Sequence, residues 1–360
     1  MRTLKYARSP VSAAAVTLLL AGTAACGGGD TTSDSEGEQL EIITNIYPMQ
    51  WLAERIGGDA VTVTNVVEIG AEPHDTELSP RQIGAVSEAD LNFYISTLQP
   101  SMDDAVSQAG GDNALDALTL VELLPFSESD QHVHEEEHAD EGDHAHESEE
   151  GQNHESEEGH AHEGEETHAT EEDHAHESEE GHAHGADDPH VWNDPVRMAT
   201  IAGALGERLG EIDPDRASAY ADRAAEVEQQ LNELDTEFSE TLSQCQQDLF
   251  VTNHTSFRYL ADRYDLRQLG ISGLKPDTEP SPARLAEVTE IVREHDIDTI
   301  FTEALTSPKV AEVLANEAGV ETDVLDPLAG LTEQQREDGE DYLSVQRANL
   351  DALSGALDCQ

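Results

Sequence analysis

The sequence predicts an α/β fold of two lobes that are joined by a long helix. Short segments rich in β-forming residues alternate with helix-like segments, both before residue 127 and after residue 244. Alternation of this kind is typical of mainly parallel sheets that helices cover on both faces. Between the two series, residues 195–244 consist almost entirely of residues that favour helices. Because α/β proteins bind ligands at the carboxyl ends of their strands, we expect a site in the cleft between the lobes.

The N-terminal lobe is expected to span residues 40–194. Its predicted strands are 41–46, 61–67, 91–96 and 118–123, and its predicted helices are 48–56 and 80–89. The linking region, 195–244, is predicted to form two helices, the second with Asp213 as its cap and Pro214 at its first position. That second helix would run for about thirty residues, or roughly 45 Å at 1.5 Å per residue. This length is enough to connect two lobes, and a solvated surface helix is the alternative.

The C-terminal lobe is expected to span residues 245–360 and to repeat the alternation. Its predicted strands are 248–253, 266–272, 298–303 and 320–326. Its predicted helices are 255–264, 281–295, 307–319 and a final helix from Thr332 to about Leu357.

The N-terminal 25 residues are typical of a secretory signal. A basic start with Arg2, Lys5 and Arg8 precedes a short apolar stretch at 11–21, which is too short to span a membrane. The junction at Ala24, Ala25 and Cys26 resembles a bacterial lipobox, with Cys26 as the acylated residue, although Thr23 departs from the usual Leu. Residues 26–39 are then expected to form a flexible tether. A simple secreted protein is the alternative.

Two further cysteines, Cys245 and Cys359, follow the predicted signal. An even pair outside the cytoplasm favours a disulfide, which would fix the C-terminus to the body of the protein. Two free thiols are the alternative.

The formal net charge is −60, which argues against a nucleic-acid partner. No basic residue occurs between Arg81 and Arg197, so polyphosphate would be repelled. The acidity is consistent with an exported protein that attracts cations.

A long insertion, 127–187, interrupts the N-terminal lobe with a degenerate repeat of histidine and acid. It holds thirteen of the seventeen histidines: His132, His134, His138, His144, His146, His154, His160, His162, His168, His174, His176, His182 and His184. Imidazole suits Zn, Cu and Ni, so the tract indicates transition-metal handling. A segment of this composition cannot bury a core and is expected to be disordered without metal. It is interpreted as a low-affinity collector or sensor of zinc, or else as a solvated loop whose metal binding is incidental.

The remaining histidines are His74, His190, His254 and His295. His74 and His254 follow predicted strands, as does Asp326, and His190 comes directly after the acidic tract. Three imidazoles and the Asp326 carboxylate would form a four-ligand site that suits Zn²⁺. His295 lies at the end of a predicted helix, where the helix dipole favours a histidine, and it is not expected to bind metal.

Several of these segments resemble the solute-binding lipoproteins of zinc-uptake ABC transporters, the cluster A-I metal-binding family. The motifs are GAEPHDTELSP at 70–80, DPHVWNDP at 188–195, VTNHTSFRYLADRY at 251–264 and VLDPLAGL at 324–331. The resemblance covers essentially everything after residue 40. It implies two α/β lobes joined by a rigid helix, with His74, His190, His254 and Asp326 as ligands of the transported Zn²⁺.

The resemblance also bears on the choice of metal and on neighbouring residues. Zinc-binding members carry His at the third ligand position, where manganese-binding members carry Glu, so His254 favours zinc. Glu303 is a second candidate for the fourth ligand or else a residue that supports the site. Trp192 is expected to pack beneath the site and to orient His190.

The function implied by the resemblance is that of an extracytoplasmic zinc receptor. It would be anchored by a lipid, act as a monomer and deliver Zn²⁺ to a membrane permease with a cytoplasmic ATPase. It would not be an enzyme, because nothing resembles a metalloprotease helix or an activated nucleophile. A manganese or iron receptor of the same fold, and a surface adhesin or zinc-buffering lipoprotein, are the alternatives.

Overall fold

The computed structural model describes residues 39–126 and 187–360. The predicted signal segment, Cys26 and all thirteen histidines of the tract lie outside these residues. In the described part of the chain, no helix is long and apolar enough to cross a membrane. The described residues form two parallel four-stranded sheets, one in each predicted lobe.

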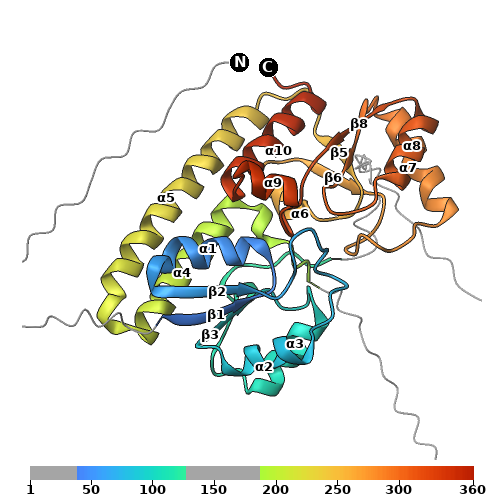
Figure 1. Cartoon of the computed structure of the whole chain (residues 1–360). Coiled ribbons are helices and arrows are strands. Elements are labelled where there is room, and N and C mark those ends of the chain that lie inside the picture. Colours follow the sequence, from blue (N-terminus) through green and yellow to red (C-terminus); the bar gives the residue numbers. More distant parts are fainter. Residues whose placement is uncertain (1–38, 127–186) are drawn as a thin grey trace, which may run out of the picture. The chain divides into compact units, whose positions relative to one another are not determined.

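The sheet of the N-terminal lobe has the strand order β2-β1-β3-β4, and every neighbouring pair is parallel. The elements, in chain order, are β1 (Leu40–Thr44), α1 (Tyr47–Gly57), β2 (Val61–Asn65), α2 (Pro80–Glu88), β3 (Leu91–Tyr94), α3 (Pro100–Ala109) and β4 (Ala114–Asp116). Successive residues of β1 pack on opposite faces of the sheet. Ile42 joins Met49 of α1, and Ile43 joins Val86 of α2 and Met102 of α3. Helices therefore cover both faces, as the sequence predicts (Figure 1).

The C-terminal lobe repeats this topology with the strand order β6-β5-β7-β8. Its elements are β5 (Leu249–Thr252), α6 (Arg258–Arg263), β6 (Arg267–Gly270), α7 (Pro282–Glu294), β7 (Thr299–Thr302), α8 (Lys309–Ala318), β8 (Glu321–Val324), α9 (Glu333–Asp338) and α10 (Tyr342–Ala356). Val251 of β5 packs with residues of α7 and α8, whereas Phe250 joins the cluster that contains Tyr342 of α10. A disulfide joins Cys245, ahead of β5, to Cys359, just after α10.

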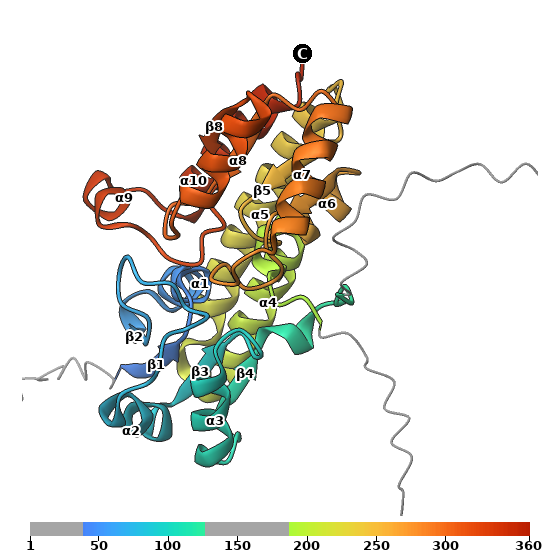
Figure 2. The same ribbon diagram turned by 90° about the vertical axis from the view of Figure 1, so that its right-hand side faces the viewer.

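Two helices link the lobes: α4 (Pro195–Ile212) and α5 (Ala217–Leu242). Asp194 caps α4 by accepting hydrogen bonds from the backbone N–H groups of Val196 and Arg197. A Cβ at Gly206 would lie 2.7 Å from the Cβ of Ala224, so the glycine allows α4 and α5 to pack closely. With 26 residues, α5 is roughly 39 Å long. It contacts α1 of one lobe and α10 of the other, which is visible in Figures 1 and 2.

Three predicted elements need correction. The predicted strand 118–123 is wrong: the fourth strand is β4, and the short 3-10 turn η2 (Ala117–Leu120) follows because the Asp116 side chain accepts from the N–H of Leu118. The predicted final helix is two helices, since Gly339 adopts a left-handed φ of 77° and Asp341 caps a new start. Pro214 begins a 3-10 turn, η5 (Pro214–Arg216), and Asp213 pairs with Arg216 and Tyr220 there instead of capping α5.

The two lobes meet around a buried tryptophan. The indole Nε1 of Trp192 donates to the carbonyl of Pro327 over 2.7 Å, and the Tyr342 hydroxyl donates to the carbonyl of Trp192 over 2.6 Å. Tyr342 also stacks on Trp51 of α1, with 5.0 Å between ring centroids. These contacts join residues from both lobes and fix the segment that begins with His190.

Candidate metal centre

His74 lies in the loop between β2 and α2, and this loop is fixed by its own polar groups. The backbone N–H of His74 donates to Glu72 Oε2 over 2.9 Å. The Thr76 hydroxyl donates to the carbonyl of Glu72, and the side-chain amide of Gln99 donates to the carbonyl of Thr76. The His74 ring is thereby held in a buried position, with 6% of its surface exposed.

His190 is fixed by a carboxylate two residues earlier in the chain. Asp188 Oδ1 lies 3.0 Å from the backbone nitrogen of His190 and 2.7 Å from its ring Nδ1. The 3-10 turn η4 (Val191–Asn193) follows, and the Trp192 ring packs 5.1 Å from the imidazole, as expected. The opposite ring nitrogen, Nε2, is buried and has no hydrogen-bond partner. A buried nitrogen of this kind is costly unless it binds something.

His254 follows β5 and is fixed in the same way, by a residue far away in sequence. Glu303 Oε1, just after β7, lies 3.0 Å from the backbone nitrogen and 2.6 Å from ring Nδ1 of His254. The other carboxylate oxygen accepts from the Thr306 hydroxyl over 3.4 Å. Glu303 therefore occupies the supporting role that was one of its two expected roles. A carboxylate on Nδ1 sets the tautomer of the imidazole and leaves Nε2 to bind a metal.

The three histidines come together between the lobes. Each offers a ring nitrogen, and the three nitrogens lie within 4.8 Å of one another. The ring centroids are 5.4 Å apart for His74 and His190, 5.4 Å for His190 and His254, and 6.1 Å for His74 and His254. Three buried imidazoles at this separation form the donor set that zinc prefers.

The three imidazoles differ in the direction in which their surroundings shift their pKa. Burial, together with the neighbouring imidazoles, lowers the pKa of His74 to about 2. Burial also lowers the pKa of His190, although Asp188 opposes the shift. Burial acts against the charged form of His254 too, but the negative charge and hydrogen bond of Glu303 raise the pKa of this ring. The N-terminal lobe thus supplies two neutral imidazoles, and the C-terminal lobe supplies one that holds a proton more readily.

Asp326 is not brought into this group. Among the described residues, two clusters have ligand atoms close enough to share an ion, and Asp326 belongs to neither. Its Oδ1 accepts from the N–H of Leu328 over 2.8 Å, and its Oδ2 accepts from Gln335 Nε2 over 2.7 Å. The carboxylate folds the turn in which Leu328 adopts a left-handed φ of 57°. Asp326 therefore lies apart from the three histidines in this conformation, and its role as a fourth ligand stays a prediction. His295 ends α7 and is likewise absent from both clusters.

The second cluster is acidic and lies beside the first. Glu72, Asp75 and Asp277 have carboxylate oxygens within 4.8 Å of one another, and the two aspartates are exposed. Burial raises the pKa of Glu72 to about 7, and a hydrogen bond with Asp75 raises the pKa of Asp277. The charge of His254 acts in the opposite direction and lowers the pKa of both Glu72 and Asp277, so these two carboxyl groups interact electrostatically with the histidine group.

Asp188 and Glu72 were not among the predicted site residues, although a sequence signal was present. The pattern acid–Pro–His occurs twice, at 72–74 and at 188–190. In both copies the carboxylate accepts a hydrogen bond from the backbone N–H of the histidine two residues on. An acidic side chain readily makes this contact with the second following residue. The repeated tripeptide marks both histidines of the N-terminal lobe.

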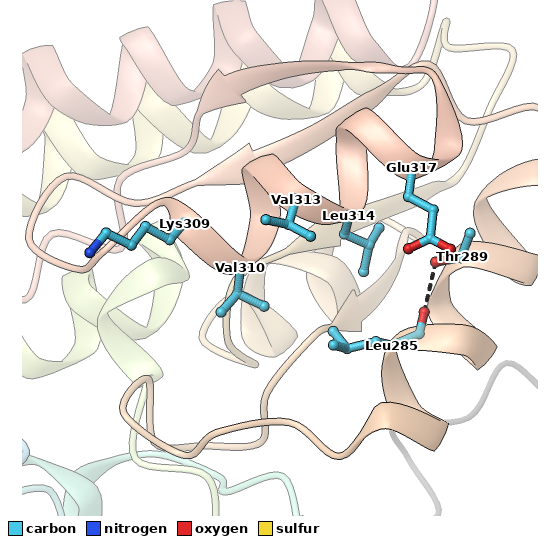
Figure 3. A pocket seen from close by; sticks show the side chains of 7 residues that line it. All are labelled: Leu285, Thr289, Lys309, Val310, Val313, Leu314 and Glu317. Carbon is cyan, nitrogen blue, oxygen red and sulfur yellow. Dashed lines mark hydrogen bonds between the residues drawn. The ribbon is translucent and has the colours of Figure 1, made fainter.

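A different cavity, of about 230 Å³, lies between α7 and α8 of the C-terminal lobe. Leu285, Val310, Val313 and Leu314 line it, as Figure 3 shows. Its two charged residues, Lys309 and Glu317, stand at opposite ends. This apolar hollow lacks the converging donors that a metal site requires.

Comparison with known proteins identifies the family. Residues 42–356 match the sequence model of a protein family that is described as zinc-uptake complex component A, periplasmic. The chain belongs to this family. The resemblance seen in the sequence motifs and the predicted two-lobed fold are thereby confirmed.

Individual members of the family are similar over most of this chain. Zinc-binding lipoprotein AdcA of Streptococcus pneumoniae strain R6 is 34% identical over 324 residues, which are 89% of this chain and 56% of AdcA. The chain thus spans just over half of that relative. High-affinity zinc uptake system protein ZnuA of Bacillus subtilis strain 168 is 32% identical over 340 residues, or 93% of each chain.

Solved structures of the family share the fold. The crystal structure of Zn(II)-bound AdcA from Streptococcus pneumoniae has a TM-score of 0.66 at 31% identity, covering 89% of this chain and 58% of that one. A structure of the laminin-binding protein of Streptococcus agalactiae, described as bifunctional with adhesin and metal-transporting activity, has a TM-score of 0.66 at 28% identity. It covers 88% of this chain and 99% of that one.

Proposed function

We propose that this protein is the extracytoplasmic zinc receptor of an ABC importer. His74, His190 and His254 would take up Zn²⁺ as cargo between the lobes and release it to a membrane permease driven by a cytoplasmic ATPase. The observation that carries the proposal is the buried Nε2 of His190, which has no partner and faces a group of two further imidazoles. The names of AdcA and ZnuA support zinc as the cargo.

The donor set favours zinc over manganese. Imidazole suits borderline ions such as Zn²⁺, whereas Mn²⁺ prefers carboxylate oxygens. The carboxylates nearest to the rings, those of Asp188 and Glu303, bind Nδ1 atoms and so leave imidazole nitrogens as the inner donors. A receptor that prefers manganese would be expected to carry a carboxylate in place of one of these rings.

Competition titration tests this proposal. The full chain would be equilibrated with Zn²⁺ or Mn²⁺ against a chelator strong enough that the many weak histidines of the tract stay empty. The proposal expects one tight site that prefers zinc and is lost in His254→Ala and in His190→Ala. His295→Ala is the matched control and should bind zinc like the wild type. A tight site that survives both ligand variants would contradict the proposal.

The fourth ligand is assigned by the same titration. Asp326 would have to leave Leu328 and Gln335 before it could reach a metal. If Asp326→Asn weakens zinc binding far more than Gln335→Ala does, the carboxylate joins the metal on binding. Equal small effects would leave Asp326 with the role of shaping its turn.

Membrane attachment and the histidine tract belong to the same proposal. Acylated Cys26 would hold a monomeric receptor at the outer face of the membrane, and the tract would collect zinc at low affinity for the cleft. Deletion of residues 132–184 should leave the tight site intact and slow zinc uptake when zinc is limiting. Unchanged uptake in that variant would reduce the tract to a solvated loop.

Adhesion is a second candidate function, favoured by the description of the laminin-binding relative. A surface receptor that binds both zinc and an extracellular matrix protein would retain matrix binding in His254→Ala. Solid-phase binding of the wild type and of this variant to laminin distinguishes the two functions. Absence of binding by the wild type would dismiss adhesion.

A further inference from the structure

The chain segments on either side of residues 127–186 pair with each other near the metal centre. Pro125 and Asp187 form an isolated antiparallel bridge. The N–H of Asp188 donates to the carbonyl of Leu124 over 3.1 Å. Asp188 is therefore part of a short two-stranded stem and, through Oδ1, the partner of both the backbone and the ring of His190.

A tyrosine of the C-terminal lobe binds both strands of this stem. The hydroxyl of Tyr259, in α6, donates to the carbonyl of Asp188 over 2.7 Å and accepts from the N–H of Leu124 over 3.0 Å. Tyr259 is fully buried. One hydroxyl thus satisfies a backbone acceptor on one strand and a backbone donor on the other, where an unpaired group would be costly.

Arg197 holds the tyrosine from the other side. Its guanidinium lies 4.7 Å from the centre of the Tyr259 ring, a distance at which a cation interacts favourably with the ring face. Its Nε donates to the carbonyl of Glu122, and its terminal nitrogen pairs with Asp194. Tyr259 is therefore confined between a cation and the stem.

We infer that Tyr259 is a positioning residue of the metal centre. By fixing the backbone of Asp188, its hydroxyl sets the direction of the Asp188 carboxylate and hence that of Nε2 in His190. Asp188 is completely buried, and its second oxygen has no partner, so its direction depends on the backbone that carries it. This inference rests on the proposed zinc site.

Tyr259→Phe tests the inference because it removes one oxygen and keeps the ring. Loss of a direct partner of a metal ligand costs roughly 10–100-fold in affinity, and Tyr259 acts one step further out. We expect zinc affinity, measured by chelator competition on the full chain, to fall by about three- to tenfold. Tyr264→Phe is the matched control: its hydroxyl lies 3.2 Å from Asp235, outside both ligand clusters, so its loss should leave zinc affinity unchanged.

A double-mutant cycle separates positioning from a purely structural role. If Tyr259 acts through Asp188, Tyr259→Phe should have little further effect in an Asp188→Asn background and its full effect in a Glu303→Gln background. With one equivalent of Co²⁺ in place of zinc, Tyr259→Phe should alter the visible absorption spectrum, and Tyr264→Phe should not. Should Tyr259→Phe fail to fold, Arg197→Lys would take its place in the cycle, because it withdraws the guanidinium from the ring.

The inference is overturned if Tyr259→Phe binds zinc and Co²⁺ like the wild type, or if its effect is additive with Asp188→Asn. The proposed zinc site would be contradicted by a different result, namely tight zinc binding that is retained in His190→Ala and His254→Ala. The two failures are therefore distinguishable in one set of proteins.

Discussion

The two lobes have the same sheet topology but fix their histidines in different ways. In the N-terminal lobe, the carboxylates of Glu72 and Asp188 act on the histidines two residues ahead of them. In the C-terminal lobe, the carboxylate comes from Glu303, which is 49 residues beyond His254 and follows a neighbouring strand. The first device is local, and the second depends on β5 and β7 lying side by side. The carboxylates of the N-terminal lobe lie next to their histidines in the sequence, whereas the carboxylate on His254 reaches its histidine only through the pairing of two strands.

Removal of the disulfide should have the largest effect, which is a loss of stability in the C-terminal lobe. Cys245 and Cys359 are 114 residues apart, and they tie the start of the C-terminal lobe to its end. Replacing both by serine should lower the free energy of unfolding by about 2–5 kcal/mol, since a long loop is released in the unfolded chain. Chemical denaturation measures this loss. An unchanged midpoint would show that the lobe does not depend on its bridge.

Replacement of the carboxylates that bind the ligand imidazoles should have the next largest effect, which is a loss of zinc affinity. Asp188→Asn and Glu303→Gln should each weaken zinc binding by roughly 10–100-fold, because each removes the negative acceptor on a ligand Nδ1. Glu303→Gln should also lower thermal stability more than Asp188→Asn, because Glu303 joins two strands whereas Asp188 acts within its own turn. Calorimetry and thermal unfolding of the metal-free proteins measure the two effects. Equal losses of thermal stability in the two variants would show that the long-range contact of Glu303 stabilises the fold no more than the local contact of Asp188.

The pH dependence of zinc binding should come from the C-terminal lobe. Zinc needs neutral imidazole, and the raised pKa of His254 means that a proton competes for this ring at higher pH than for a free histidine. The pKa of His74 is lowered to about 2 and that of His190 is also lowered, so a proton competes less for these two rings than for His254. Affinity should therefore fall as the pH drops through the raised pKa of His254.

Glu303→Gln supplies the control for this pH dependence. Without the carboxylate that raises the pKa of His254, the fall in zinc affinity should begin at lower pH than in the wild type. Titration of zinc binding across pH in both proteins measures the shift. The same midpoint in both would assign the titration to another group.

The acidic cluster gives the smallest expected effect. Asp75 comes from the N-terminal lobe and Asp277 from the C-terminal lobe, and both are exposed. Their charge should speed the arrival of a cation, and salt should screen this effect. Asp75→Asn combined with Asp277→Asn should slow zinc association by a few-fold at low salt and hardly at all at high salt. Stopped-flow measurement at two salt concentrations tests this, with Asp265→Asn as the control.

Much of the fold and of the site could be predicted from the sequence, and the omissions have physical reasons. The β-rich runs around Ile42 and Val251 identify central strands, because both faces of each are buried. The short strand β4 was missed because its three residues are only partly buried and the more apolar run after it turns at Asp116.

For the metal centre, the sequence likewise predicts the local motifs but not the contacts that depend on the folded chain. His74, His190 and His254 are found from their positions in the motifs, whereas the hydrogen bonds of Asp326 to Leu328 and Gln335 depend on a turn that a linear pattern does not reveal. The partnership of Tyr259 with Asp188 spans 71 residues and crosses from one lobe to the other. Contacts of that range follow from the folded arrangement, and no local spacing indicates them.

The central claim is that three histidines from two lobes hold one zinc ion. Anomalous diffraction at the zinc absorption edge, from crystals grown with one equivalent of Zn²⁺, tests it most directly. The account predicts a single strong peak about 2.0–2.1 Å from a ring nitrogen of each of His74, His190 and His254. A peak at any other place in the described lobes, or one that misses any of the three rings, would contradict it.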